Sequence, residues 1–134
     1  MEVTEERIRN SRKTQDILHL LEENGIDEVH IKCQKCGRHG SSIFRGYFDA
    51  DPPYIGICED QIETDTELEN VLCHELTHYL DYERGNKLDN GSDVLRSEIH
   101  ASYYGDCYED KDRVSWKRKG CILNTALHNT EVSL

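Results

Sequence analysis

Long apolar runs are missing from this chain of 134 residues. A helix that spans a bilayer needs roughly 18 consecutive apolar residues, and no stretch approaches that length. The first residues, MEVTEERIRN, contain no apolar segment of the kind found in a signal peptide, and their glutamates are atypical of a transit peptide. We therefore expect no membrane-spanning segment and neither of these two leaders.

Basic residues are also scarce. The 16 lysines and arginines are outnumbered by 27 aspartates and glutamates, which gives a formal net charge of −11. A nucleic-acid-binding surface needs an excess of positive charge. The composition therefore predicts a soluble protein without a nucleic-acid partner.

Cysteine, by contrast, is abundant, with six residues in a short chain. Six cysteines can pair in about 15 ways, and the sequence does not choose among them. They would form disulfides in an oxidising compartment and remain thiols or metal ligands in a reducing one. One alternative is a structural zinc site built from Cys33, Cys36, Cys58 and one further ligand.

The length suits a single domain, residues 1–134, with one core of modest size. Periodicity and turn residues predict an α+β fold with a short antiparallel sheet. Thr64 and Glu67 have the spacing of a capping box, and Ser92 is a suitable N-cap. The predicted elements are helices over 4–24, 66–84, 92–104 and 121–128, a strand over 29–32, and a hairpin formed by 41–50 and 54–58.

The segment VLCHELTHYLDYERG, residues 71–85, places two histidines and a glutamate inside the second long helix. Histidines at positions i and i+4 lie about 6 Å apart along one face, so His74 and His78 can bind one Zn²⁺ through imidazole nitrogens. Glu75 can take a proton from a water molecule that the zinc acidifies. This pattern is the metalloprotease signature with Glu75 as general base. The alternative is a solvated polar face, since Leu68, Leu72 and Leu76 mark the core face on the other side.

The third zinc ligand has two candidates. Asp81 lies about 4.5 Å beyond His78 along the helix axis, so it is better placed to fix an imidazole tautomer than to bind the metal itself. Glu98 lies on the inward stripe of the next helix with Leu95, Ile99 and Ser102, where a lone carboxylate is costly unless it is paired or metal-bound. Its spacing from His78 resembles that of the thermolysin-like zincins. We predict Glu98 as the ligand, with Asp81 in the second shell or as the alternative ligand.

Other polar residues are weaker candidates. His100 is predicted to face outward and is not expected to bind metal. Tyr103 or Tyr104 could donate a hydrogen bond to the oxyanion of a reaction intermediate. His128 is expected at the surface.

Taken together, these motifs resemble the mitochondrial inner membrane metalloprotease family, the M76 peptidases that mature and assemble ATP synthase. The resemblance runs from about residue 12 to residue 128. It is carried by four features in order: Cys33-x-x-Cys36 with the strand Gly46–Ala50, the strand Ile57–Cys58, His74-Glu75-Leu76-x-His78-x-x-Asp81, and Ser97-Glu98 leading to Gly105-Asp106-Cys107.

The resemblance implies a zinc endopeptidase with one catalytic Zn²⁺, located in the mitochondrial intermembrane space and bound peripherally to the inner membrane. Its substrate would be the precursor of an ATP synthase membrane subunit, which it would also help to assemble. We expect the substrate to lie extended along an edge strand that includes Tyr54–Cys58.

Two departures from the family accompany these expectations. Family members usually continue beyond the position of Leu134, and Cys73 is atypical. A Cys107–Cys121 disulfide is one pairing that the even cysteine count permits. Two other functions stay open, a non-proteolytic assembly chaperone that retains the zinc site and an SprT-like DNA-associated protease, which shares the HELxH pattern.

Overall fold

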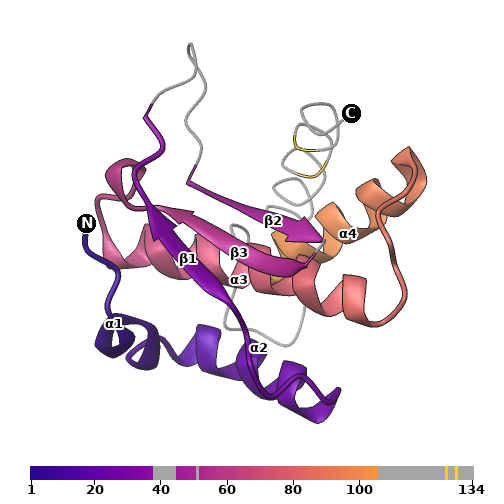
Figure 1. The fold of residues 1–134 in the computed structure, drawn as a ribbon, viewed down its shortest axis with the longest axis horizontal. Helices are drawn as coiled ribbons and strands as arrows, with labels where there is room; N and C mark the ends of the chain where they lie inside the picture. The colour runs from indigo at the N-terminus through magenta and orange to yellow at the C-terminus, as the bar shows by residue number, and fades with distance from the viewer. Residues whose placement is uncertain (38–44, 51, 106–125, 127–128, 130–134) are drawn as a thin grey trace.

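The computed structural model describes residues 1–37, 45–50, 52–105, 126 and 129 (Figure 1). It confirms an α+β fold, in which one long helix lies behind a small sheet and is flanked by other helices. The predicted helix over 121–128 and the Cys107–Cys121 pair lie outside the described residues. In chain order the elements are α1 (Glu5–Arg9), α2 (Arg12–Glu23), β1 (Ile31–Gln34), β2 (Gly46–Ala50), β3 (Pro53–Cys58), the 3₁₀ turn η1 (Glu59–Gln61), α3 (Asp65–Glu83) and α4 (Gly91–Tyr104).

Helix α3 is the centre of the molecule and packs against α2, α4, β2 and β3. The hydroxyl of Thr64 accepts a hydrogen bond from the Glu67 backbone N–H at 3.1 Å, which begins the helix as the sequence predicts. Every residue from Val71 to Leu80 is buried. The histidine-bearing face is therefore covered by α4 and is not the solvated polar face considered as an alternative, although neither histidine belongs to the hydrophobic core cluster.

The sheet has the strand order β1-β3-β2. Strands β2 and β3 form the predicted antiparallel hairpin, but β1 pairs with β3 in parallel, so the sheet is mixed. The central position of β3 corrects the expectation that a substrate lies along Tyr54–Cys58. Both sides of β3 are already hydrogen-bonded, and an added strand needs a free edge.

The N-terminal helix is broken where one continuous helix was predicted. Helix α1 ends at Arg9. Ser11 has an extended backbone, and its hydroxyl accepts a hydrogen bond from the Thr14 N–H at 3.1 Å, so it caps the start of α2. The strand predicted over 29–32 lies at β1, two residues later. Helix α4 begins earlier than predicted, because Asn90 rather than Ser92 supplies the N-cap.

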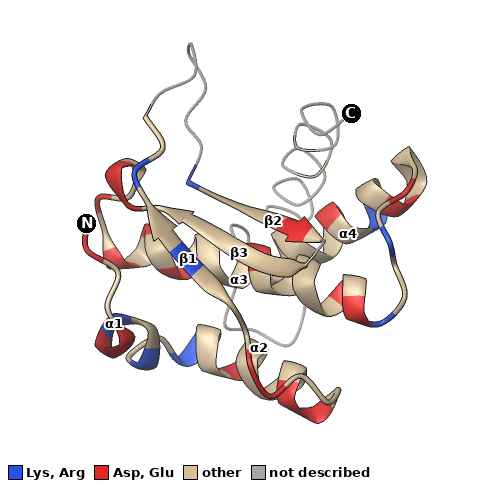
Figure 2. Ribbon diagram, viewed as in Figure 1, with Lys and Arg blue, Asp and Glu red and all other residues tan. Residues whose placement is uncertain are grey.

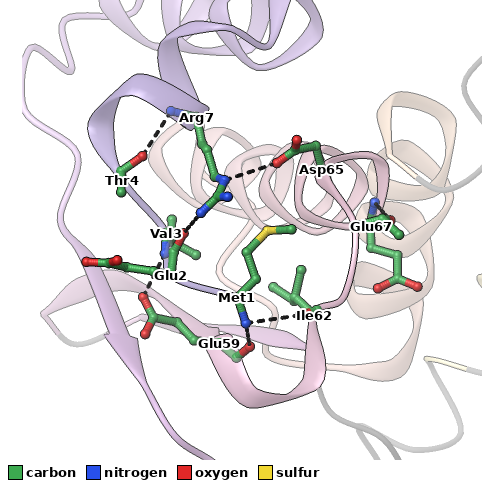
Figure 3. A network of polar contacts seen from close by, with 10 residues as sticks. Met1, Glu2, Val3, Thr4, Arg7, Glu59, Ile62, Asp65 and Glu67 are labelled. Atoms are coloured by element: carbon green, nitrogen blue, oxygen red, sulfur yellow. Dashed lines mark hydrogen bonds and ion pairs between the residues drawn. The ribbon is translucent and has the colours of Figure 1, made fainter.

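The first residues are tied to the start of α3 by polar contacts (Figure 3). The Met1 ammonium donates to the carbonyls of Glu59 at 2.8 Å and Ile62 at 3.2 Å. Arg7 forms an ion pair with Asp65 at 3.3 Å in the first turn of α3. These contacts hold the N-terminal segment beside the helix that carries the histidines.

Candidate metal centre

His74 and His78 lie one turn apart on α3 and face α4. Their rings are 4.9 Å apart and nearly perpendicular. Each Nε2 atom lies against the carboxylate of Glu98, His74 at 3.1 Å from Oε2 and His78 at 3.0 Å from Oε1. The packing of α4 on α3 thus brings one carboxylate onto two imidazoles that are fixed by helix periodicity.

Glu98 is 6% exposed, which is unusual for a carboxylate. Burial by itself raises the pKa of the Glu98 carboxyl, but hydrogen bonds and charge from His74 and His78 outweigh burial and lower that pKa well below its ordinary value. Asn129 adds a hydrogen bond to Oε2 at 3.1 Å. The surroundings of Glu98 therefore favour its ionised form, which is the form that binds a cation.

The three side chains fit a divalent metal ion. Their ligand atoms all lie within 4.8 Å of one another, and they form the one such cluster of three metal-binding side chains in the described part of the chain. Tetrahedral coordination at about 2.0–2.1 Å needs donor atoms about 3.4 Å apart. The two imidazole–carboxylate distances found here, 3.1 Å and 3.0 Å, are close to that value. Two imidazoles and a carboxylate are also a donor set typical of catalytic zinc.

Glu75 is adjacent to His74 and is 9% exposed. A Cβ atom built on Gly46 would lie 3.4 Å from its Cγ atom, so Glu75 lies beneath the start of β2. The side chain therefore belongs to the residue after His74 and lies close to the outer strand of the sheet. Its role as general base stays a prediction.

Asp81 does not belong to the metal-binding cluster. Its Oδ2 accepts a hydrogen bond from the Ser97 hydroxyl at 2.9 Å, and the Ser97 oxygen lies 2.7 Å from Nδ1 of His78. Nδ1 of His100 lies 2.8 Å from Oδ1 of Asp81. Asp81 thus reaches the imidazole of His78 through a serine, and His100, although not in the cluster, has a polar partner.

The sequence did not single out Ser97 or Asn129 as contacts of the cluster. Ser97 precedes Glu98 and is fully buried, and its placement depends on how α4 docks on α3. The sequence offers only its position directly before the predicted ligand, which does not say what its hydroxyl contacts. Ile99 was wrongly assigned to the inward stripe of α4; it is 37% exposed, while Ser97, Glu98, Ala101 and Ser102 form the buried face.

The rings of the α4 tyrosines contact each other and the ring of His100, which is not a member of the cluster. Tyr104 packs its ring against His100 at 5.0 Å and against Tyr103 at 5.0 Å. Oxyanion stabilisation by either residue stays a prediction. His128 lies outside the described residues.

Two of the four described cysteines form a disulfide instead of contributing to a metal site. Cys36 and Cys58 are bonded, which removes two thiolates from the structural zinc site considered as an alternative. Cys33 is an exposed free thiol. Cys73 is buried, and burial raises the pKa of its thiol to about 11, so this cysteine is protonated at neutral pH.

A His-x-x-x-His helix beneath a small mixed sheet, followed by a helix that supplies a buried glutamate, is the arrangement of a zincin-like metallopeptidase domain. The chain belongs to the peptidase M76 family, whose model matches residues 2–131. This membership supports a metallopeptidase function with protein or peptide substrates. No curated protein and no solved structure matched the chain.

Proposed function

We propose that the protein is a zinc metalloendopeptidase in which His74, His78 and Glu98 hold one Zn²⁺. The observation that carries this proposal is the convergence of the three buried side chains, each with a ligand atom within 4.8 Å of the others. Bound there, Zn²⁺ would acidify a water molecule and polarise the scissile carbonyl.

Glu75 is the general base of this proposal. It accepts a proton from the attacking water and returns that proton to the leaving amine. It directly follows His74 in α3 and is not one of the three clustered side chains. Its burial excludes bulk water, which strengthens its electrostatic effect on nearby charges.

The substrate lies extended along the outer edge of β2. No strand in the described ranges pairs with this edge. The Cys58 N–H donates to the Arg45 carbonyl at 2.9 Å, and alternation along an antiparallel pair then directs the backbone polar groups of Gly46 and Phe48 outward. A peptide added there would pass above Glu75 and bring its scissile bond to the cluster.

The biological role that we propose follows the family. The enzyme processes the precursor of an ATP synthase membrane subunit, and helps that subunit assemble, in the mitochondrial intermembrane space at the inner membrane. The Cys36–Cys58 disulfide supports an oxidising compartment. None of the helices in the described ranges is both long and apolar enough to cross a bilayer.

A Glu75→Gln variant tests the enzymatic proposal. It should bind Zn²⁺ like the parent and lose cleavage of a peptide spanning the processing site by about 100-fold or more, because the amide cannot accept the proton. Equal cleavage by the variant and the parent would show that the mechanism is wrong. The matched control is Glu83→Gln, at the end of the same helix and exposed, which should cleave normally.

The same variant separates cleavage from assembly. In cells that lack the endogenous enzyme, Glu75→Gln should leave the precursor unprocessed while ATP synthase still assembles. If the protein is instead a non-proteolytic chaperone, the precursor should be processed to the same extent in cells that carry the parent and in cells that carry Glu75→Gln. An SprT-like function predicts salt-dependent DNA binding instead. In the view of Figure 2 acidic residues occur along the described helices, and none of these helices is lined with basic residues, which does not favour that function.

A further inference from the structure

A serine connects the candidate metal ligand His78 to a carboxylate that lies outside the cluster. Ser97 is fully buried, and its hydroxyl oxygen lies 2.7 Å from Nδ1 of His78 and 2.9 Å from Oδ2 of Asp81. The other oxygen of Asp81 is 2.8 Å from Nδ1 of His100. The four side chains alternate between α3 and α4, so they form a polar connection across the packed helices.

The chemistry of these groups fixes the direction of each hydrogen bond. A carboxylate oxygen only accepts, so the single hydroxyl proton of Ser97 is donated to Asp81. The oxygen of Ser97 is then left as an acceptor toward His78. Nδ1 of His78 therefore carries a proton and donates it to Ser97, which leaves Nε2, the nitrogen that faces Glu98, as the one that would bind the metal.

We propose that Ser97 is a positioning residue that, with Asp81 behind it, holds His78 in the tautomer that presents Nε2 to the metal. The inference rests on the proposed function for the presence of the metal, but the hydrogen bonds themselves do not depend on it. We call the connected side chains of His78, Ser97 and Asp81 the relay. His100 supports the relay by occupying Oδ1 of Asp81, so that Oδ2 is directed at Ser97.

One consequence is that α4 contributes twice to the same centre. Glu98 provides a ligand directly, and the preceding residue, Ser97, orients a ligand that belongs to α3. Residues that orient a metal-binding histidine from behind typically change metal affinity by about 10- to 100-fold when they are removed. The alignment of α4 along α3 therefore determines whether Glu98 can reach the metal and whether His78 is oriented to bind it.

The test compares Ser97→Ala with Ser102→Ala in the full chain. Both serines lie on α4 and are fully buried, but the hydroxyl of Ser102 has no hydrogen-bond partner in the described ranges. Zn²⁺ affinity is measured by competition with a chelator. We expect about 10- to 100-fold weaker binding for Ser97→Ala and parental binding for Ser102→Ala. Equal affinity of both variants for Zn²⁺ would overturn the relay.

Nitrogen NMR of the His78 ring gives a second readout that a general loss of packing would not reproduce. In the Zn²⁺-loaded parent and in Ser102→Ala, Nδ1 should carry a slowly exchanging proton and Nε2 should bear the metal. A parent in which Nδ1 binds the metal or lacks its proton contradicts the proposal. This measurement decides the matter if Ser97→Ala does not fold.

Asp81→Asn probes the far end of the relay at a side chain that is 13% exposed. In the amide an NH₂ group replaces one of the two carboxylate oxygens, so Ser97 and His100 cannot both keep their present acceptors, and Zn²⁺ binding should weaken in the same direction as in Ser97→Ala. Parental affinity in Asp81→Asn would remove Asp81 from the relay. If the parent itself binds no Zn²⁺, the proposed function fails, whereas a parent that binds with variants that match it refutes the relay alone.

Discussion

Two imidazoles and a carboxylate share one buried position, and this is the central feature at the residue scale. Burying a charge is costly unless it is paired and hydrogen-bonded. Glu98 meets that condition through His74 and His78, whose Nε2 atoms lie within 3.1 Å of its oxygens. The same geometry that satisfies the carboxylate without a metal leaves the three donors grouped for one.

The lowered pKa of Glu98 predicts how the metal-free protein responds to acid. Its folded-state pKa lies below the value of about 4.3 in an unfolded chain, so the unfolded state binds the proton more readily. The stabilisation is therefore complete above about pH 5 and is lost as the pH falls toward and through the folded-state value. Urea unfolding between pH 6 and pH 2 measures this loss.

Glu98→Gln is the control for the acid response. The variant has no carboxyl at this position, so its unfolding free energy should fall less steeply over the same acid range than that of the parent. Identical slopes in both proteins would mean that Glu98 is not ionised in the buried cluster.

The residues of the cluster differ in how far the sequence could place them. Helix periodicity alone puts His74 and His78 on one face. The inward position of Glu98 follows from the same periodicity, and its contact with both imidazoles is a finding of the structure. Ser97 could not be placed from sequence, because a serine reaches a neighbour only when the two helices dock in one register. Their roles in binding metal stay predictions.

At the scale of elements, β2 approaches α3 closely at Gly46. A Cβ atom on Gly46 would lie 2.6 Å from Cγ1 of Val71 and 3.1 Å from the Gly56 carbonyl oxygen. No side chain larger than hydrogen fits there without displacement. The lack of a side chain at Gly46 thus allows β2 to lie close to α3 at Glu75.

Gly46→Ala should therefore move β2 away from α3. We expect a loss of about 1–3 kcal/mol in unfolding free energy, as for other overpacked sites, together with reduced cleavage. A Gly46→Ala, Val71→Ala double variant should recover part of the loss caused by Gly46→Ala, because the atom that the new methyl group meets is gone. Additive effects of the two changes in urea unfolding would contradict this packing account.

Element boundaries show where sequence reasoning was sufficient. Thr64 begins α3 as predicted, because a threonine followed by Glu67 has a local chemical reason to cap a helix. Ser11 and Asn90 were missed although they act in the same way. Ser11 also donates to Glu69 at 2.5 Å, so its capping position is supported by a contact between α2 and α3 that no local pattern reveals.

At the scale of the whole molecule, the α+β class was predictable and the sheet topology only in part. Alternating apolar residues around a Pro-containing turn indicate the β2–β3 hairpin. The parallel pairing of β1 with β3 is a long-range contact, and no turn chemistry encodes it. The central position of β3, and hence the choice of β2 as the substrate edge, follows from that pairing.

The Cys36–Cys58 disulfide stabilises the molecule by linking the segment after β1 to the end of β3. The two residues are 22 positions apart, so the chain-entropy model predicts a contribution of about 3 kcal/mol. Replacing both by serine should lower the unfolding free energy by about that amount. Cys33→Ser, which removes an exposed free thiol, is the matched control and should have little effect.

The central claim is that His74, His78 and Glu98 together hold one divalent metal ion. The most direct test is metal analysis of the protein purified under oxidising conditions, compared with His74→Ala and Glu98→Ala. We predict one equivalent of zinc in the parent and its loss in both variants. A parent without bound metal, or variants that retain the full equivalent, would contradict the claim.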